Sequence, residues 1–239
     1  MTWAPLLPAP LGAEAESAGI SAWFTTRAAG NLDPHLASPT QASSRKVEAN
    51  RQALDDVVGH PIRYAHHVHG VEVADGAHPQ PEPRVDAWCA TQPGAYAVLA
   101  ADCLPILLAD SHAGVVGAVH AGRVGVLTGV VRQAIAAMCE RGARKIRAVI
   151  GPSICGRCYE ISPSMARELG EEGQLIGTSR WGGPSLDLPA LATSQMRAAG
   201  VEVDSLGLCT LEDERFFSHR STTRGDGRHG GIIALNPRP

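Results

Sequence analysis

Three histidines lie close together in the stretch RYAHHVHGVEV, at His66, His67 and His69. An imidazole ring can act as a general base or as a metal ligand near neutral pH. In a regular β-strand alternate side chains point to the same face, so a strand here would place His67 and His69 together and His66 on the other side. The pattern therefore favours His67 and His69 as residues that carry chemistry, with His66 a surface or packed residue.

A cysteine follows an apolar run in the stretch LAADCLPILLAD, at Cys103. Most cysteines in such a setting are inert core thiols, because a reactive or metal-binding role requires a thiolate and a suitable partner. His120 and His69 are the candidate partners, and the strand that ends at His120 can lie near the strand that precedes Cys103. Two histidines, one cysteine and one open position make up the ligand count of a catalytic zinc site.

A glycine-rich turn follows His120 in the stretch AVHAGRVGVLTG. It joins a predicted strand to a predicted helix, and the free N–H groups of a helix N-terminus can bind an anion such as phosphate. Gly122, Arg123 and Gly125 are the residues that could hold such an anion. A tight turn between strand and helix would require the same glycines, and the sequence favours neither interpretation.

Two further motifs are weaker evidence for a metal or redox site. Cys155 and Cys158 form a single C-x-x-C without a second pair or the flanks of a thioredoxin motif, so we interpret the pair as structural. His67 and His69 form the single H-x-H of the sequence. Because a trinuclear copper centre needs several such pairs, copper is less favoured than zinc as the metal.

Composition narrows the class of partner. With 21 basic and 24 acidic residues, the 239-residue chain has a net charge of -3 and offers no electrostatic footprint for nucleic acid or an anionic membrane. The N-terminus lacks a basic region and the most apolar run contains Asp102 and Pro105, so neither a signal peptide nor a membrane span is predicted. Six irregularly spaced cysteines are typical of reduced thiols, which predicts a cytoplasmic protein with a small-molecule ligand.

The periodicity of apolar residues predicts one domain of the α+β class over 1–239, with an irregular segment at 1–19. Hairpin-like strand pairs around 95–120 break a regular βαβ alternation and argue against a doubly wound sheet. Helices are predicted over 43–59, 126–142 and 187–200, and a long polar loop over 218–230. Strands are predicted over 20–26, 62–69, 95–101, 104–109, 114–120, 145–150, 201–209 and 231–235.

Several motifs in a fixed order give the chain a resemblance to the YfiH-like family, whose members are named laccase-domain (multicopper polyphenol oxidase) proteins or purine nucleoside phosphorylases. Such a series is far more specific than any one motif. The resemblance extends from about residue 20 to residue 235. The matching stretches are FTTR (24–27), ANR (49–51), VHG (68–70), ADCLPILL (101–108), AVHAG (118–122), IGPSI with CYEI (150–161), and CT with FFSHR (209–220).

The resemblance implies a mixed α/β/β/α sandwich and a zinc ion held by His69, Cys103 and His120. It also implies phosphorolysis of adenosine, inosine, guanosine and methylthioadenosine, together with hydrolytic deamination of adenosine. Phosphorolysis needs cationic donors for phosphate, and arginine suits phosphate geometry better than lysine does. On this basis Arg27 and Arg220 are the expected catalytic arginines, alongside Cys103 and His120, whereas Arg51 is expected to be a structural helix residue.

The chain departs from the family pattern at three places, one of which is TTRAAG (25–30) where the family has TTRxGG. Where the family has H-A-G-W-R-G this chain has HAGRVG, so Arg123 replaces a tryptophan and Val124 replaces an arginine. Arg123 could supply the phosphate-binding charge from the adjacent position. His67 replaces a glutamine and is predicted to lie next to the metal ligands, either supporting them or as an additional ligand.

Two other functions stay open at this point. In one, Cys103 is the nucleophile and His120 the base of a hydrolase that acts on an amide of a peptidoglycan precursor. In the other, the chain keeps a metal but has lost turnover, an alternative motivated by Arg123 and Val124. The expected partners are a purine nucleoside and phosphate, without nucleic acid or membrane, and the expected state is a monomer or weak oligomer.

Overall fold

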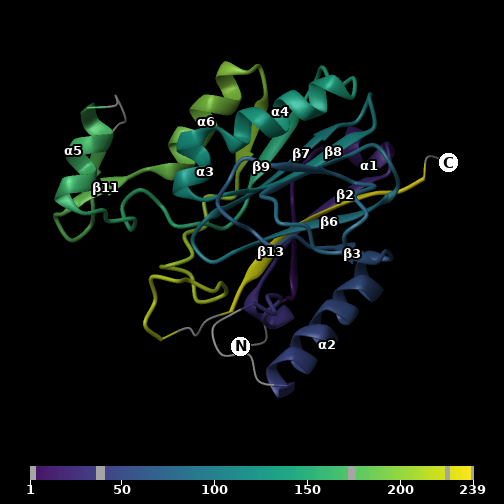
Figure 1. Ribbon diagram of the computed structural model, residues 1–239, viewed down its shortest axis with the longest axis horizontal. Coiled ribbons are helices and arrows are strands. Elements are labelled where there is room, and N and C mark those ends of the chain that lie inside the picture. Colours follow the sequence, from purple (N-terminus) through teal and green to yellow (C-terminus); the bar gives the residue numbers. More distant parts are fainter. Residues whose placement is uncertain (1–3, 36–40, 172–175, 224–226, 238–239) are drawn as a thin grey trace.

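Two β-sheets stacked face to face form the middle of the molecule (Figure 1). The computed structural model describes residues 4–35, 41–171, 176–223 and 227–237. Among these residues the first sheet has the order β1 (Leu6–Pro8), β2 (Ile20–Thr25), β13 (His229–Leu235), β6 (Gly94–Ala100) and β3 (Ile62–Arg63). The second sheet has the order β12 (Glu202–Ser205), β9 (Arg147–Ile150), β7 (Leu104–Asp110), β8 (Val115–Ala121), β5 (Ala87–Ala90) and β4 (Val73–Asp75).

The facing sides of the two sheets bury a common apolar core. The first sheet contributes Phe24 and Ile233 and the second contributes Trp88 and Leu107, all of them fully buried. The indole N–H of Trp88 also donates to the carbonyl of Ala97 in the opposite sheet, at 3.2 Å. Burial on this scale is the main source of stability in a domain of this size, and it fixes the positions of the strand ends that carry the site.

Helices cover the outer face of each sheet (Figure 1). On the second sheet lie α3 (Arg123–Thr128), α4 (Val130–Glu140) and α6 (Leu188–Ala198), and on the first lies α2 (Gln41–Val58). Spacings of three and four residues explain why α4 packs by one face, because they put its apolar side chains on one stripe. That stripe consists of Val130, Val131, Ala134, Ile135 and Met138. The predicted α/β/β/α sandwich is therefore confirmed.

Several element boundaries differ from those predicted. The strand expected over 62–69 ends at Arg63, because the chain then leaves the sheet and His69 takes a left-handed φ of 59°. The helix expected over 126–142 is two helices, since Gly129 with a φ of 106° separates α3 from α4. The strand expected over 201–209 is confined to β12. The helix expected over 187–200 is α6, capped by Asp187.

The N-terminal segment 1–19 was expected to be irregular, which was wrong for its described residues, since 4–19 contain a strand and a helix. Strand β1 pairs with β2, and helix α1 (Ala13–Ser17) buries Ala15 beside the sandwich core. The prediction failed because both elements are too short to show a period. The same holds for β4, for β5, and for the hairpin of β10 (Ile176–Thr178) and β11 (Pro184–Leu186), which lies beside α5 (Pro163–Glu171).

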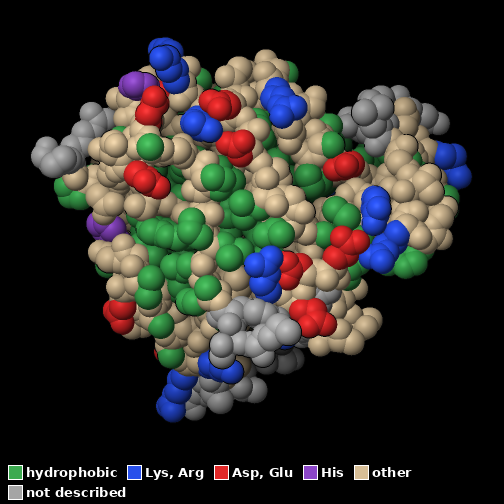
Figure 2. Space-filling view, turned by 180° about the vertical axis from the view of Figure 1, so that it is seen from behind, with side chains coloured by type: hydrophobic (Ala, Val, Ile, Leu, Met, Phe, Trp, Pro, Cys, Tyr) green, Lys and Arg blue, Asp and Glu red, His purple; other side chains and the backbone are tan. Residues whose placement is uncertain are grey.

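The surface carries mixed charge. Figure 2 shows acidic and basic side chains interspersed on one face around a group of hydrophobic side chains. Within the described part of the chain, none of the helices is long and apolar enough to cross a membrane.

A buried histidine at the start of β13 predicts how stability depends on pH. His229 is fully buried, its Nε2 faces the carbonyl of Pro152 at 3.3 Å, and burial lowers its pKa from 6.5 to about 4. Because the unfolded chain takes up this proton first, the stabilisation is complete above pH 6.5 and is lost as the pH falls through the window from 6.5 to 4. The shift corresponds to about 3 kcal/mol.

We expect His229→Gln to flatten this part of the pH dependence, since glutamine keeps a donor for Pro152 but does not titrate. Urea unfolding of both proteins between about pH 4 and pH 7 measures the difference. If the free energy of unfolding fell equally in both proteins as the pH is lowered, the pH dependence could not be assigned to His229.

Candidate functional site

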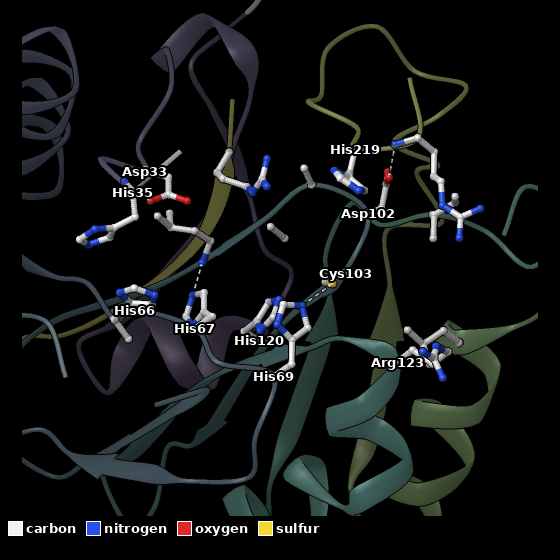
Figure 3. Close-up of a pocket in the computed structure, with 18 of the residues that line it drawn as sticks. Asp33, His35, His66, His67, His69, Asp102, Cys103, His120, Arg123 and His219 are labelled. Atoms are coloured by element: carbon white, nitrogen blue, oxygen red, sulfur yellow. Dashed lines mark hydrogen bonds between the residues drawn. The ribbon is translucent and has the colours of Figure 1, made fainter. Parts of the chain in front are cut away.

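A cavity of about 480 Å³ opens at one end of the sandwich (Figure 3). Its volume lies within the range of pockets that bind small molecules. The cavity is bounded by the loop after β3, by the turn between β6 and β7, by the start of α3, and by the segment before β13. His66, His67, His69, Cys103 and His120 all line it.

Three potential metal ligands meet in the cavity. One donor atom each from His69, Cys103 and His120 lies within 4.8 Å of the others, and the distance from Cys103 Sγ to His69 Nε2 is 3.9 Å. Strands 95–101 and 114–120 were expected to lie near each other, and β6 and β8 do so, although they belong to different sheets and are not paired. The pairing of β7 with β8 brings Cys103 and His120 together, since it sets Pro105 opposite His120.

An aspartate that the sequence analysis missed holds this arrangement. The carboxylate of Asp86, fully buried just before β5, accepts from His120 Nδ1 at 2.9 Å. It also accepts from the backbone N–H groups of Val68, His69 and Gly70, at 3.3, 3.0 and 2.7 Å. Asp86 therefore keeps a proton on His120 Nδ1, so that Nε2 is the ring nitrogen that a metal would bind in place of a proton. Asp86 also holds the loop that carries His69.

The charges of Cys103 and His120 depend on one another. Burial alone raises the pKa of the Cys103 thiol, but the imidazoles of His120 and His69 outweigh burial and lower that pKa to about 6. Burial lowers the pKa of His120, but Cys103 and Asp86 more than offset it and raise that pKa to about 9. Cys103 is therefore a thiolate near neutral pH, which is the form that a metal binds and the form that attacks as a nucleophile.

Backbone geometry at the site is unusual. His69 and Asp102 have φ values of 59° and 90°, a region that residues other than glycine seldom occupy. Asp102, next to Cys103, is held there because its carboxylate accepts from Thr210 Oγ1 at 2.6 Å and from the N–H of Arg220 at 2.8 Å. Strain of this kind persists where the surroundings enforce it, and it gathers at functional sites.

His67 lies against the ligand cluster but has no ring nitrogen left for a metal. The N–H of Leu99 donates to His67 Nε2 at 2.9 Å, so Nδ1 carries the proton and donates to the carbonyl of Val85 at 3.1 Å. The ring stacks on His120, with centroids 4.4 Å apart. His66, expected on the surface or in the core, instead lines the cavity and stacks on His35, with centroids 4.5 Å apart.

We expect His67→Gln to keep the metal, because an amide can accept from Leu99 and donate to Val85 as the imidazole does. Loss of the stacked ring should lower the free energy of unfolding by about 1 kcal/mol. His67→Ala, which leaves both backbone groups unpaired, should cost about 2–3 kcal/mol. Metal analysis with denaturant unfolding measures both, and a metal-free His67→Gln protein would show that His67 is a ligand after all.

Some of the arginines line the cavity and others lie outside it. Arg123 and Arg220 line the cavity, as do Arg51 and Arg228, whose presence there was not predicted. Arg27 does not line it: its guanidinium donates to the carbonyl of Glu214 and lies 5.6 Å from the ring centre of Phe217, and its role beside phosphate stays a prediction. The missed arginines come from α2 and from the segment before β13, which only the folded chain brings together.

Arg123 and Arg220 are held differently. Arg220 lies over the ring of Tyr159, 4.9 Å from its centre, and donates to the carbonyl of Glu160 at 3.0 Å. Arg123 is the first residue of α3, and its side chain has no hydrogen-bond or ion-pair partner among the described residues. The predicted 218–230 loop contributes His219, Arg220 and Arg228 to the cavity, while its residues 224–226 lie outside the described part of the chain.

An α/β/β/α sandwich with a cavity that gathers two histidines and a cysteine defines a class of candidate metalloproteins. The family described as multi-copper polyphenol oxidoreductase laccase matches residues 21–236. The chain therefore belongs to this laccase-domain, YfiH-like family.

Individual relatives agree with this placement. A purine nucleoside phosphorylase of Corynebacterium glutamicum is 39% identical over 239 residues, which covers 89% of this chain and 93% of that protein. One of Streptomyces coelicolor is 41% identical over 201 residues, covering 80% and 83%. The crystal structure of a Neisseria meningitidis protein has a TM-score of 0.82 at 28% identity, covering 98% of this chain and 100% of that one.

Proposed function

We propose that this protein is a zinc-dependent purine nucleoside enzyme. Its reactions are the phosphorolysis of adenosine, inosine, guanosine and methylthioadenosine, and the hydrolytic deamination of adenosine. The observation that carries the proposal is the group of His69, Cys103 and His120 in a cavity of about 480 Å³ that is also lined by arginines. The relatives named purine nucleoside phosphorylase support the substrate class.

The donor set suits zinc. Bond lengths to zinc of about 2.3 Å for sulfur and 2.0 Å for nitrogen put two tetrahedral donors about 3.5 Å apart, close to the 3.9 Å between Cys103 Sγ and His69 Nε2. At Gly122 an added Cβ would lie 2.7 Å from the His69 ring and 3.1 Å from Cys103 Sγ, so the chain leaves this space open. When bound, zinc acts as a Lewis acid and lowers the pKa of water.

The arginines of the cavity suit phosphate. Arg123, Arg220 and Arg228 line it together, and guanidinium groups bind phosphate through paired N–H donors. Phosphorolysis of inosine breaks the bond between C1′ and the purine and forms a bond from C1′ to phosphate, with a proton taken up by the leaving base. His66 and His219 line the cavity and are the candidates for the acid that supplies this proton.

The base requires an apolar surface with polar groups at its edge. Leu99, Ala100, Ile154, Tyr159 and Leu188 supply the apolar part of the cavity. Such surfaces exclude water from the reacting bonds, which strengthens the electrostatic interactions within the site.

A second candidate is a cysteine hydrolase acting on an amide of a peptidoglycan precursor. The observation in its favour is the Cys103 thiol, whose pKa of about 6 beside His120 suits a nucleophile paired with an acid or base. The two candidates differ in the use of Cys103, which is a metal ligand in the first and forms a covalent bond to substrate in the second.

Metal content and adenosine turnover of the Cys103→Ser variant distinguish them. For the zinc enzyme, we expect the variant to lose the zinc of this site and its release of inosine and ammonia from adenosine and water. Full zinc occupancy in Cys103→Ser, combined with loss of amide hydrolysis, would support the hydrolase. An active, zinc-free wild-type protein would exclude the zinc proposal.

A further inference from the structure

Three cysteines and a glutamate form a second cluster outside the cavity. Cys155, Cys158, Cys209 and Glu212 each place a potential ligand atom within 4.8 Å of the others, and none of the four lines the cavity. We call these residues the cysteine cluster. Cys158 and Cys209 are buried, Cys155 is partly buried, and the Glu212 side chain is 39% exposed.

Two tight turns build the cysteine cluster. In the first, the N–H groups of Cys158 and Tyr159 donate to the carbonyl of Cys155 at 2.9 and 3.0 Å, which brings the two thiols of the C-x-x-C pair together. In the second, the N–H of Glu212 donates to the carbonyl of Cys209 at 3.1 Å. A bridge between Ser153 and Cys209 joins the turns, so residues far apart in sequence share one site.

A backbone N–H and two arginines lie beside the ligand atoms of the cysteine cluster. The N–H of Cys155 points to Cys209 Sγ at 3.5 Å, and Arg180 Nη1 lies 3.9 Å from Cys158 Sγ. Arg180 also donates to Glu212 at 2.8 Å, and Arg157 lies 3.8 Å from the same carboxylate. Four anionic ligands exceed the charge of a divalent cation by two, and these two guanidinium groups supply that counter-charge.

Apolar packing of free thiols, or a disulfide, would each explain only part of the cysteine cluster. Apolar packing explains the buried thiols, and ion pairs with Arg180 and Arg157 explain the Glu212 carboxylate, but neither requires all four ligand atoms to converge. A disulfide would join two of the cysteines and leave the third without a partner. We propose that the cysteine cluster is a second metal site, in which Cys155, Cys158 and Cys209 bind zinc through Sγ and Glu212 binds through its carboxylate, with the thiol protons released to solvent.

A metal here would be structural, because four protein ligands leave no open position. It would join the turn at 153–160 to the segment at 208–213. Both support the cavity, since Ile154 and Tyr159 line it and Thr210 donates to Asp102. This proposal is independent of the proposed function, because it concerns residues that do not reach the cavity.

The test uses the full-length Cys103→Ala variant, produced with zinc in the medium, so that the ligand set of the cavity is incomplete. We expect about one zinc ion per chain by mass spectrometry, with X-ray absorption showing three sulfur neighbours at about 2.3 Å. Adding Cys155→Ser and Cys158→Ser should remove that zinc, whereas adding Cys139→Ser, at an exposed cysteine of α4, should leave it in place.

Three results would overturn the proposal: a zinc-free Cys103→Ala protein, zinc with at most one sulfur neighbour, or a disulfide among the cluster cysteines in the intact mass. The absorption measurement requires no change in the cysteine cluster, so it decides the question even if the double serine variant fails to fold. As a milder change, Glu212→Gln should weaken zinc binding at least about tenfold and leave the sulfur neighbours unchanged.

Discussion

Gly122→Ala should lower kcat/KM at least about 100-fold and leave the protein folded. The added methyl group would lie 2.7 Å from Cδ2 of His69 and 3.1 Å from Sγ of Cys103, distances that force these side chains to move. Displacement of reacting groups by about 1 Å lowers rates by about 100-fold, so we expect kcat/KM to fall at least that far. Steady-state kinetics and zinc analysis of the cavity site measure the effect.

The matched control is Gly170→Ala. An added methyl group on Gly170, in helix α5, has its nearest neighbour 4.0 Å away, at Ile176, so this change tests the same substitution without crowding. It should leave zinc content and kinetics as they are. Wild-type kinetics in Gly122→Ala would show that the space around His69 and Cys103 does not serve the reaction.

Asp86→Asn should have two large effects. An amide keeps one acceptor oxygen, so its NH2 group must face either the N–H of His69, which bonds Oδ1, or the N–H of Gly70, which bonds Oδ2; either way buried groups are left unpaired. We expect the free energy of unfolding to fall by about 2–4 kcal/mol. Because Asp86 also sets the proton of His120 on Nδ1, zinc affinity should fall by about 10–100-fold.

Asp110→Asn separates the two effects. Asp110 is a buried aspartate at the end of β7 that accepts from the N–H groups of Ala113, Arg144 and Lys145, but it does not line the cavity. Its substitution should lower stability without changing zinc affinity. If Asp86→Asn behaves in the same way, Asp86 serves the fold alone and does not position His120.

The proposed ligand set could be predicted from the sequence only in part. Cys103, His69 and His120 stand out by residue type, and the order of motifs links them. Asp86 does not stand out, because a single aspartate before a four-residue strand resembles any turn residue. Its role depends on the pairing of β5 with β8, which places the Asp86 carboxylate beside His120.

The failed predictions share a physical cause. Alternation was used to place His67 and His69 on one face, but the chain after Arg63 is not a strand, and hydrogen bonds to Leu99 and Val85 set the position of His67. Arg27 contacts Glu214 and Phe217, residues far from it in sequence, and is not among the residues that line the cavity. Long-range contacts decide both positions, and local periodicity carries no information about them.

The sequence predicts the layers of the fold better than it predicts the order of strands within each sheet. Long apolar strands such as β7 and β8, and the apolar stripe of α4, are visible as patterns in the sequence. The division of β6 and β8 between two sheets is not, because both are equally apolar and buried. The same limit explains why Cys155 and Cys158 looked like an isolated pair before the fold added Cys209 and Glu212.

The most direct test of the central claim is chromatography of inosine incubated with the zinc-loaded protein, with and without inorganic phosphate. The proposed function predicts hypoxanthine and ribose 1-phosphate in equal amounts, formed only with phosphate, and neither product with the Cys103→Ala variant. Intact inosine after incubation of zinc-loaded wild-type protein with phosphate would contradict the claim, as would equal cleavage by the Cys103→Ala variant.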